Sequence, residues 1–389
     1  MPLFEPFHAL RYNREKVDPA LVTAPPYDVI GPAEREELLR RSPHNVVRID
    51  LPIGDDPYTE AANVFSQWKN DAVIERDEEP SFTVYRMEAI DGDGYRRTTT
   101  GVIGSLQLSR PGEGDILPHE FTTPKAKSDR LDLLRSTNTN LSPVWGLSPS
   151  LALTELLTTA AEPWCDYSAD DVHHMLWKIT DPDRVALIQK AVSEHPVVIA
   201  DGHHRYETSL QYRDEQNGRG GTGSVMAFIV ELAPEELWVG PIHRLITNID
   251  ASVSIEDWLN EFFQVQPFDY QGVGTIARLQ KMGALAAVLP DRMLALVPRP
   301  EKMEGVRDLD SQRLDTALAA LGNATVTYQH GIDNIRYAVA NGDAQLGVLL
   351  RPVTVEQIVD IANGGERMPP KSTFFEPKPR TGLVFRDLA

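Results

Sequence analysis

The feature that most constrains this sequence is an apolar strand that runs directly into a helix through a single glycine. The apolar run Pro196–Ala200 predicts a buried strand, Asp201-Gly202 predicts a tight turn, and the residues from His203 to about Gln216 predict a helix. Such a junction belongs to proteins that pack helices against sheets. We therefore expect an α+β protein with mixed sheets.

Other segments support this mixed class. Alternating residues at Phe82–Tyr85 and Thr98–Leu108 predict a hairpin, and Asn45–Ile49 predicts a strand. The run Val225–Leu232 predicts a further buried strand. Thr354–Gln357 is a capping box that predicts the start of a last helix.

We expect three regions along the chain. They are an N-terminal α+β region (1–110), a core region that contains the Asp201 turn (111–248), and a C-terminal α/β region (249–389). Three roles stay open for the C-terminal region: it could cover a cleft, bind a substrate or form a homodimer.

Charge and cysteine content exclude several classes of function. The 38 basic and 57 acidic residues give a net charge of −19, which disfavours binding to nucleic acid or to an anionic membrane. The one cysteine, Cys165, excludes a disulfide within the chain, a thiolate zinc site and a two-cysteine redox centre. With no apolar run of about 18 residues and no signal-peptide pattern, we expect a cytoplasmic protein without a membrane span.

The Asp201 turn is a candidate anion site. Backbone N–H groups and the helix dipole attract anions at a helix start, and Gly202 allows a phosphate to approach the backbone closely. His203, His204 and Arg205 add side-chain donors, while Asp201 could cap the helix or hold magnesium. The alternative is a capped helix with solvated polar residues; the concentration of donors in one turn favours the anion site.

A second candidate site begins at His119. Glu120 lies beside it and is followed by Lys125, Lys127 and Arg130, so its carboxylate should stay ionised and could accept a proton from a substrate hydroxyl. Spacing alone fits a surface loop and a charged helix equally well.

The pair His243-Arg244 follows a strand pattern. It could line the same cleft as the Asp201 turn, or it could be a solvated strand end.

The chain resembles a bacterial and archaeal family catalogued as domain-of-unknown-function family 1015. The resemblance rests on short motifs spread over essentially the whole sequence: 24–30, 117–130, 140–145, 200–207, 243–245 and 368–377. The family name itself implies no activity.

The stretch Asp201-Gly202-His203-His204-Arg205 also resembles the phosphate-binding box of the ParB/sulfiredoxin superfamily, which includes free-serine kinases. That resemblance implies a ParB/sulfiredoxin-like core in which these five residues bind the phosphates of ATP or ADP. It further implies that Glu120 is the catalytic base, with His204 as a second catalytic residue.

Two members of that superfamily are disfavoured by departures from their patterns. Sulfiredoxins need a cysteine directly after the box glycine, where this chain has His203. ParB proteins of the partition type bind DNA, which the net charge of −19 disfavours.

These observations lead to a nucleotide- and magnesium-dependent phosphotransferase acting on a small hydroxyl substrate, with L-serine as the first candidate. Asp201 would hold the metal, and the expected substrate contacts are His119, Lys125, Lys127, Arg130, His243 and Arg244. Two alternatives stay open. One is a phosphoserine phosphatase that uses the same turn, and the other is a nucleotide-binding switch without catalysis.

Overall fold

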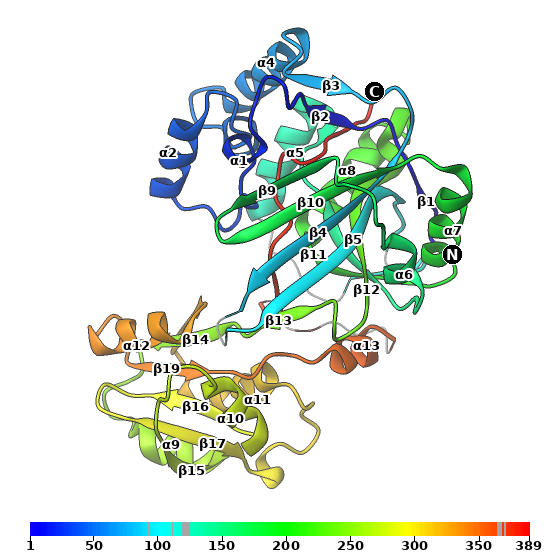
Figure 1. The fold of residues 1–389 in the computed structure, drawn as a ribbon. Coiled ribbons are helices and arrows are strands. Elements are labelled where there is room, and N and C mark those ends of the chain that lie inside the picture. Colours follow the sequence, from blue (N-terminus) through cyan, green and yellow to red (C-terminus); the bar gives the residue numbers. More distant parts are fainter. Residues whose placement is uncertain (92–93, 111, 119–124, 364–367, 369–370) are drawn as a thin grey trace.

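A computed structural model of the chain describes residues 1–389 except 92–93, 111, 119–124, 364–367 and 369–370. The described residues form two large sheets with helices around them, one above the other in the view of Figure 1, and three two-stranded pairs. The expected class of mixed α and β structure is therefore confirmed.

The larger sheet contains nine strands of the described chain, in the order β6-β11-β8-β12-β5-β4-β10-β9, with β1 beside β5. Its strands are β1 (Phe4–Glu5), β4 (Phe82–Ile90), β5 (Arg96–Gln107), β6 (Ile116–Pro118), β8 (Val144–Ser148), β9 (Cys165–Ala169), β10 (Val172–Ile179), β11 (Val197–Asp201) and β12 (Ser224–Glu231). The pairs β11–β6 and β12–β8 are parallel and the others antiparallel, so the sheet is mixed.

The helices that precede β12 in the chain accompany this sheet. They are α1 (Pro19–Val22), α2 (Pro32–Arg41), α3 (Val47–Asp50), α4 (Pro57–Asn70), α5 (Lys125–Thr137), α6 (Leu153–Leu157), α7 (Pro182–Ser193) and α8 (His203–Glu215). The predicted strand at Asn45–Ile49 is wrong, because this segment forms α3. The Asn45 side chain accepts a hydrogen bond from the Val47 N–H at 3.0 Å, and Val47 and Ile49 are fully buried, so the apolar run reflects burial and not strand structure.

The smaller sheet has the order β15-β17-β16-β19-β14-β18, and every pairing in it is antiparallel. Its strands are β14 (His243–Thr247), β15 (Phe263–Phe268), β16 (Leu285–Val288), β17 (Met293–Pro298), β18 (Thr325–Gln329) and β19 (Leu346–Leu349). The accompanying helices are α9 (Ile255–Phe262), α10 (Thr275–Met282), α11 (Asp310–Leu318) and α12 (Ile332–Ala340). Alternation of helices and strands led us to expect α/β structure here, but the antiparallel pairing makes this region α+β.

After the helix α13 (Val355–Asn363) the chain returns from the smaller sheet to the larger one, as the red trace in Figure 1 shows. The capping box that starts α13 is confirmed, since Thr354 N–H donates to Gln357 Oε1 at 2.9 Å and Gln357 N–H donates to Thr354 Oγ1 at 3.3 Å.

Short strand pairs hold the returning segment in place. Strand β20 (Phe374–Glu376) pairs with β13 (Trp238–Gly240), and β21 (Arg386–Asp387) pairs with β7 (Thr139–Asn140). A further two-stranded pair joins β2 (Leu10–Tyr12) to β3 (Ile74–Arg76).

Strand pairing connects the three regions that we expected. The boundary at residue 110 falls between β5 and β6, which belong to the same sheet, and the boundary at 248 follows β14, which already lies in the smaller sheet. The division into three folding units stays a prediction.

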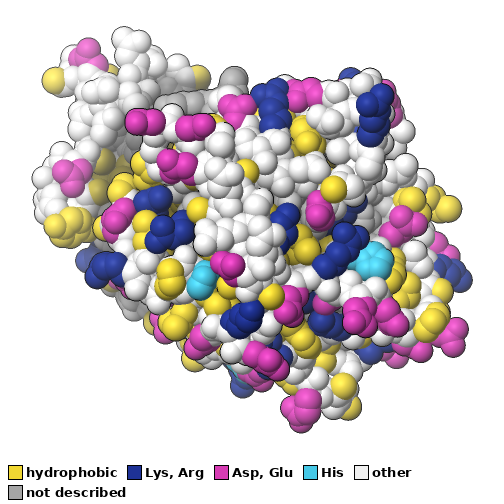
Figure 2. Space-filling model, turned by 90° about the horizontal axis from the view of Figure 1, so that it is seen from above, with side chains coloured by type: hydrophobic (Ala, Val, Ile, Leu, Met, Phe, Trp, Pro, Cys, Tyr) yellow, Lys and Arg dark blue, Asp and Glu magenta, His cyan; other side chains and the backbone are white. Residues whose placement is uncertain are grey.

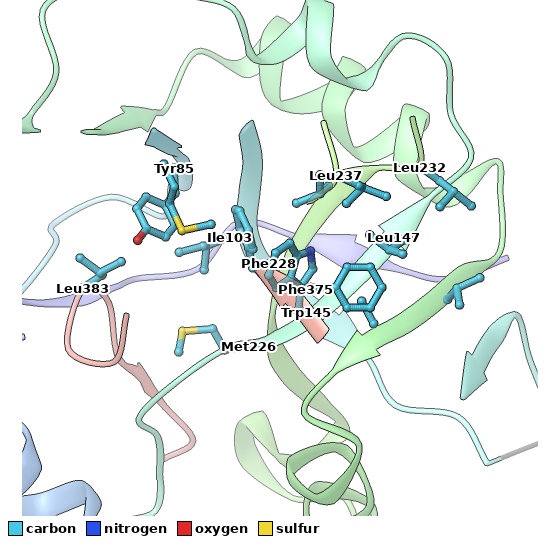
Figure 3. Close-up of a cluster of buried hydrophobic side chains, with 14 of the residues drawn as sticks. Tyr85, Ile103, Trp145, Leu147, Met226, Phe228, Leu232, Leu237, Phe375 and Leu383 are labelled. Atoms are coloured by element: carbon cyan, nitrogen blue, oxygen red, sulfur yellow. The ribbon is translucent and has the colours of Figure 1, made fainter. Parts of the chain in front are cut away.

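Alternate residues of the central strands face opposite sides of the larger sheet, and both sides are buried. On strand β4, Tyr85 and Met87 belong to one apolar cluster while Phe82 and Val84 belong to the other. Figure 3 shows the first cluster, in which Phe375 of the returning segment lies with Trp145 and Phe228. The C-terminal segment is therefore part of the core.

No helix of the described residues is long and apolar enough to cross a membrane. On the face shown in Figure 2, basic and acidic side chains are interspersed.

The contribution of the returning segment to stability can be tested by a substitution at one of its core residues. Phe385 is fully buried, with ring centroids 5.6 Å from Tyr12 and 5.3 Å from Phe65. We expect Phe385→Ala to lower the free energy of unfolding by about 3–5 kcal/mol, measured by urea denaturation. Tyr95→Ala, at a side chain that is 65% exposed, is the control and should change it by less than about 0.5 kcal/mol. Equal effects of the two substitutions would contradict a core role for the segment.

Candidate functional site

The Asp201 turn has the geometry that the sequence predicts. Strand β11 ends at Asp201, Gly202 adopts a left-handed conformation (φ 87°), and α8 begins at His203. The Tyr206 N–H donates to the Gly202 carbonyl at 2.9 Å and closes the first helical turn. No acidic residue lies in that turn, so the N-terminus of α8 keeps the positive potential of its dipole.

Arg205 folds back over Gly202. Its Nη2 donates to Asp201 Oδ2 at 2.8 Å, and its Nη1 donates to Ser142 Oγ at 3.1 Å and to the Pro143 carbonyl. A Cβ on Gly202 would lie 2.9 Å from Arg205 Nη2, so glycine is needed here for space as well as for its backbone angle. The Arg205 Nε is buried without a hydrogen-bond partner among the described residues.

The second cation at Asp201 comes from the far end of the sequence. Lys378, on the returning C-terminal segment, forms an ion pair with Asp201 Oδ1, and its ammonium group lies 4.8 Å from the centroid of the Phe374 ring. Burial alone would raise the pKa of Asp201, but Lys378 and Arg205 outweigh it and hold this pKa well below its ordinary value. Asp201 is therefore an ionised carboxylate that holds two cations at the start of α8.

A second buried charge cluster lies beside the first. Arg130 of α5 donates to Asp50 Oδ1 at 2.9 Å and to the Asp50 carbonyl at 2.8 Å, and its guanidinium lies 4.2 Å from the centroid of the Tyr27 ring. Burial outweighs the neighbouring arginines and raises the pKa of Asp50, and burial raises the pKa of Tyr27 to about 12. The two clusters are coupled, since Arg205 acts electrostatically on both Asp50 and Tyr27.

Two cavities border this assembly. A small polar cavity of about 50 Å³ lies between the two clusters, and its polar lining comprises Asp50, Arg130, Thr139, Asn140, Ser142, Arg205, Thr208 and Ser209. A larger one of about 380 Å³ borders the first turns of α8 and is lined by Arg110, Ile199, His203, Tyr206, Glu207, Leu210, Gln211 and Asp214. The start of α8 is therefore accessible to a ligand.

The structure brings together motifs that are far apart in the sequence. Tyr27, Arg130, Ser142 and Arg205 belong to four separate segments that carry the resemblance to family 1015, and all four surround the small cavity or contact a residue that lines it. Convergence of this kind is typical of a functional site.

The structure describes only part of the second candidate site. His119 and Glu120 lie outside the described residues, and of Lys125 and Lys127 only the backbone, in α5, is described. Strand β6 ends at Pro118, which pairs with Ile199 of the parallel strand β11. The chain therefore enters this segment at the same edge of the sheet as the Asp201 turn.

Three expected substrate residues have structural contacts. Arg130 is bound to Asp50, as described above. His243 and Arg244 lie on β14 in the smaller sheet. His243 Nδ1 accepts from the Leu350 N–H at 3.2 Å and burial lowers its pKa to about 3, while Arg244 donates to the Ile242 carbonyl at 2.7 Å. Both side chains are buried, so the alternative of a solvated strand end is wrong, and a place for them in the Asp201 cleft stays a prediction.

Sequence reasoning missed two members of the site, Lys378 and Asp50. Lys378 directly follows the C-terminal motif of the family resemblance, which was the one available signal. Asp50 directly follows the segment that we predicted as a strand, and nothing in the sequence marks it as a partner of Arg130.

The described residues do not fit a metal site held by Asp201. Both of its carboxylate oxygens are in ion pairs with cations, and no group of three or more His, Cys, Asp or Glu side chains in the described part could hold a metal ion. In this structure Asp201 holds Arg205 and Lys378, and its expected role as a magnesium ligand stays a prediction.

A family model matches residues 4–317, and its description is Protein of unknown function (DUF1015). The chain belongs to this family. No curated protein matches it.

Three solved structures illustrate what the fold is similar to. A free serine kinase in complex with AMP is 13% identical, with 67% of this chain and 83% of that chain covered and a TM-score of 0.36. A conserved hypothetical protein from Pyrococcus furiosus is 15% identical, with 69% and 90% covered and a TM-score of 0.37. SbnI with a C-terminal truncation, from Staphylococcus aureus, is 11% identical, with 72% and 86% covered and a TM-score of 0.41.

The dual role of Gly202 can be tested by substitution. Gly202→Ala should destabilise the protein by about 1–2 kcal/mol through its positive φ alone, and by more because the new Cβ displaces the Arg205 guanidinium. Gly218→Ala is the matched control, since Gly218 follows the same helix with φ 68° and open space around its Cβ position. Urea denaturation of both variants should give a larger loss for Gly202→Ala; an equal loss would show that Arg205 does not need this space.

The ion pair of Lys378 predicts a dependence of stability on pH. Because the folded-state pKa of Asp201 is depressed, the pair contributes stability above the ordinary value of 3.8, and this contribution is lost as the pH falls through the folded-state pKa. Lys378→Met should therefore lower the free energy of unfolding by about 1–3 kcal/mol at pH 7, and the deficit should narrow below pH 3.8. Urea denaturation at pH 7 and pH 3 measures this, with Lys281→Met, on α10, as the control. A deficit that is the same at both pH values would contradict the ion pair.

Proposed function

We propose that this protein is a nucleotide-dependent phosphotransferase that acts on a small hydroxyl substrate, with L-serine as the first candidate. In this proposal the larger sheet contains a ParB/sulfiredoxin-like core, the nucleotide occupies the 380 Å³ cavity, and its phosphates lie at the start of α8. The single observation that carries the proposal is the clustering of Arg205 and Lys378 on Asp201, at a helix N-terminus beside a cavity.

The physical argument is electrostatic. Transfer of a phosphoryl group spreads negative charge over its oxygens, and positioned N–H groups and cations stabilise that charge. The first turn of α8 supplies backbone donors and the imidazoles of His203 and His204, while Arg205 and Lys378 supply positive charge. Asp201 keeps the two cations in place, so little reorganisation is required when the phosphates bind.

The small polar cavity supports an acceptor that carries an amino group. Asp50 is 3% exposed, and its Oδ2 has no hydrogen bond of good geometry in the described part of the chain. A buried carboxylate oxygen of this kind is costly unless a donor meets it. An ammonium group beside the reacting hydroxyl, as in an amino acid alcohol, is the complementary donor.

In this proposal Glu120 accepts the hydroxyl proton while the acceptor oxygen forms a bond to phosphorus and the bond to the leaving nucleotide breaks. Glu120 lies outside the described residues, and its role comes from the resemblance to free-serine kinases. Its position two residues after Pro118, whose strand pairs with β11, is consistent with this role.

Phosphorus NMR of the purified protein tests the proposal. We expect MgATP or MgADP with L-serine to yield phosphoserine, and phosphoserine alone to stay intact. Inorganic phosphate released from phosphoserine without nucleotide would instead identify a phosphatase. Nucleotide binding without turnover of any small hydroxyl substrate would identify a switch.

Two substitutions separate nucleotide binding from chemistry. Arg205→Lys removes a planar, multidentate donor while keeping the charge, and should weaken nucleotide binding by about 10- to 100-fold in calorimetry. Glu120→Gln should leave binding unchanged and abolish turnover. Arg213→Lys on the same helix and Glu194→Gln at the end of α7 are the matched controls, and both should behave like the unmodified protein. Normal turnover of Glu120→Gln would show that another group is the base.

A further inference from the structure

A third cavity, larger than the two that border the Asp201 turn, has no residue of that turn in its lining. It has a volume of about 850 Å³ and lies between the larger and the smaller sheet units. Its walls come from the tip of the β4–β5 hairpin, from the β13–β20 pair, from the segments around α10 and α12, and from the start of α13. Figure 1 shows the hairpin extending toward the smaller unit, where these elements meet.

This cavity has the size and surface of a small-molecule site. Pockets that bind small ligands typically have about 300–1,000 Å³, and this cavity falls in that range with a lining of mixed apolar and polar side chains. Here the side chains of Trp238, Tyr270, Ile332, Val353 and Phe374 supply apolar and aromatic surface. A ligand with an apolar or aromatic part would be well accommodated.

The charge of the lining is negative. Asp91, Asp333, Glu356 and Glu376 line the cavity, and Arg97 is the one Lys or Arg among its lining residues in the described part. Asp91 is paired with Arg97 (2.7 Å) and Asp333 with Arg336 (3.2 Å), so the uncompensated negative charge of the lining comes from Glu356 and Glu376.

The two histidines of the lining add no positive charge at neutral pH. Loss of solvent lowers the pKa of His243 to about 3 and also lowers the pKa of His330. The cavity is therefore complementary to a cation.

Glu376 is the half-buried carboxylate in the lining of this cavity. It lies on β20, and a Cβ on Gly240 of the paired strand would come within 3.1 Å of its Oε2. No hydrogen bond or ion pair joins its carboxylate to another described residue.

Burial raises the pKa of Glu376 to about 7, with a further contribution from Asp91 that Lys378 opposes. A carboxylate in this state is costly to ionise unless a cation approaches it. Lys378 acts on Glu376 electrostatically but forms its ion pair with Asp201, so no described cation is paired with Glu376.

We propose that this cavity binds a small organic cation, in which an ammonium group pairs with Glu376 and an apolar or aromatic part packs against Phe374 and Trp238. The ring of Trp238 favours a nearby cation as well, while the ring of Phe374 already contacts Lys378 and His330. The inference does not depend on phosphotransferase activity, because none of the residues that line this cavity belongs to the Asp201 turn.

Isothermal titration calorimetry of the full chain with phenethylamine tests the proposal. The uncharged analogue 2-phenylethanol has the same ring and chain length, so it isolates the contribution of the ammonium group. We expect phenethylamine to bind at least 10-fold more tightly than 2-phenylethanol. Equal binding of the two compounds, or no measurable binding of phenethylamine, would overturn the proposal.

Substitutions locate the binding event. Glu376→Gln should reduce the affinity for phenethylamine at least 10-fold and leave that for 2-phenylethanol unchanged, while Glu261→Gln, at an exposed position on α9, should change neither. Thermal unfolding of each variant checks that it folds. The indole N–H signal of Trp238, assigned with Trp238→Phe, should shift on addition of phenethylamine. A ligand that binds without moving this signal, or that binds Glu376→Gln normally, would place the cation elsewhere and contradict the proposal.

Discussion

The ion pairs of Asp201 are the interaction on which the rest of the candidate site depends. One carboxylate at the end of β11 holds Arg205 of α8 and Lys378 of the C-terminal segment. Arg205 in turn donates hydrogen bonds to Ser142 Oγ and to the Pro143 carbonyl. A buried charge of this kind is stable only while its partners stay in place. Asp201 therefore connects the start of the helix, a loop and the end of the chain.

The C-terminal segment makes this arrangement possible. After the smaller sheet is complete, the chain returns through β20 and β21, and Phe375, Leu383 and Phe385 enter the apolar clusters of the larger unit. Burying these side chains fixes the backbone on either side of Lys378, so the ammonium group reaches Asp201 from a supported position. The smaller unit is thus an insertion between two parts of the chain that form one core.

Structural features that depend on residues adjacent in the sequence could be predicted from the sequence. The β4–β5 hairpin, the turn at Gly202 and the capping box of α13 were all predicted, because each depends on residues that are neighbours in the sequence. The segment around Val47 was predicted wrongly, because full burial produces the same apolar run in a strand and in a short helix. The burial of His243 and Arg244 on β14 could not be predicted, because the pairing of strands that are remote in the sequence is not a local property.

The sequence by itself determined the phosphate-site hypothesis. Gly202 and the donors that follow it mark a helix N-terminus, since glycine adopts the left-handed φ of 87° without strain. Only the tertiary structure decided that Lys378 would neutralise Asp201, that Asp50 would bind Arg130, and that a cavity would form beside Glu376. These contacts join residues that are remote in the chain, and the pairing of strands and the burial of apolar side chains bring them together.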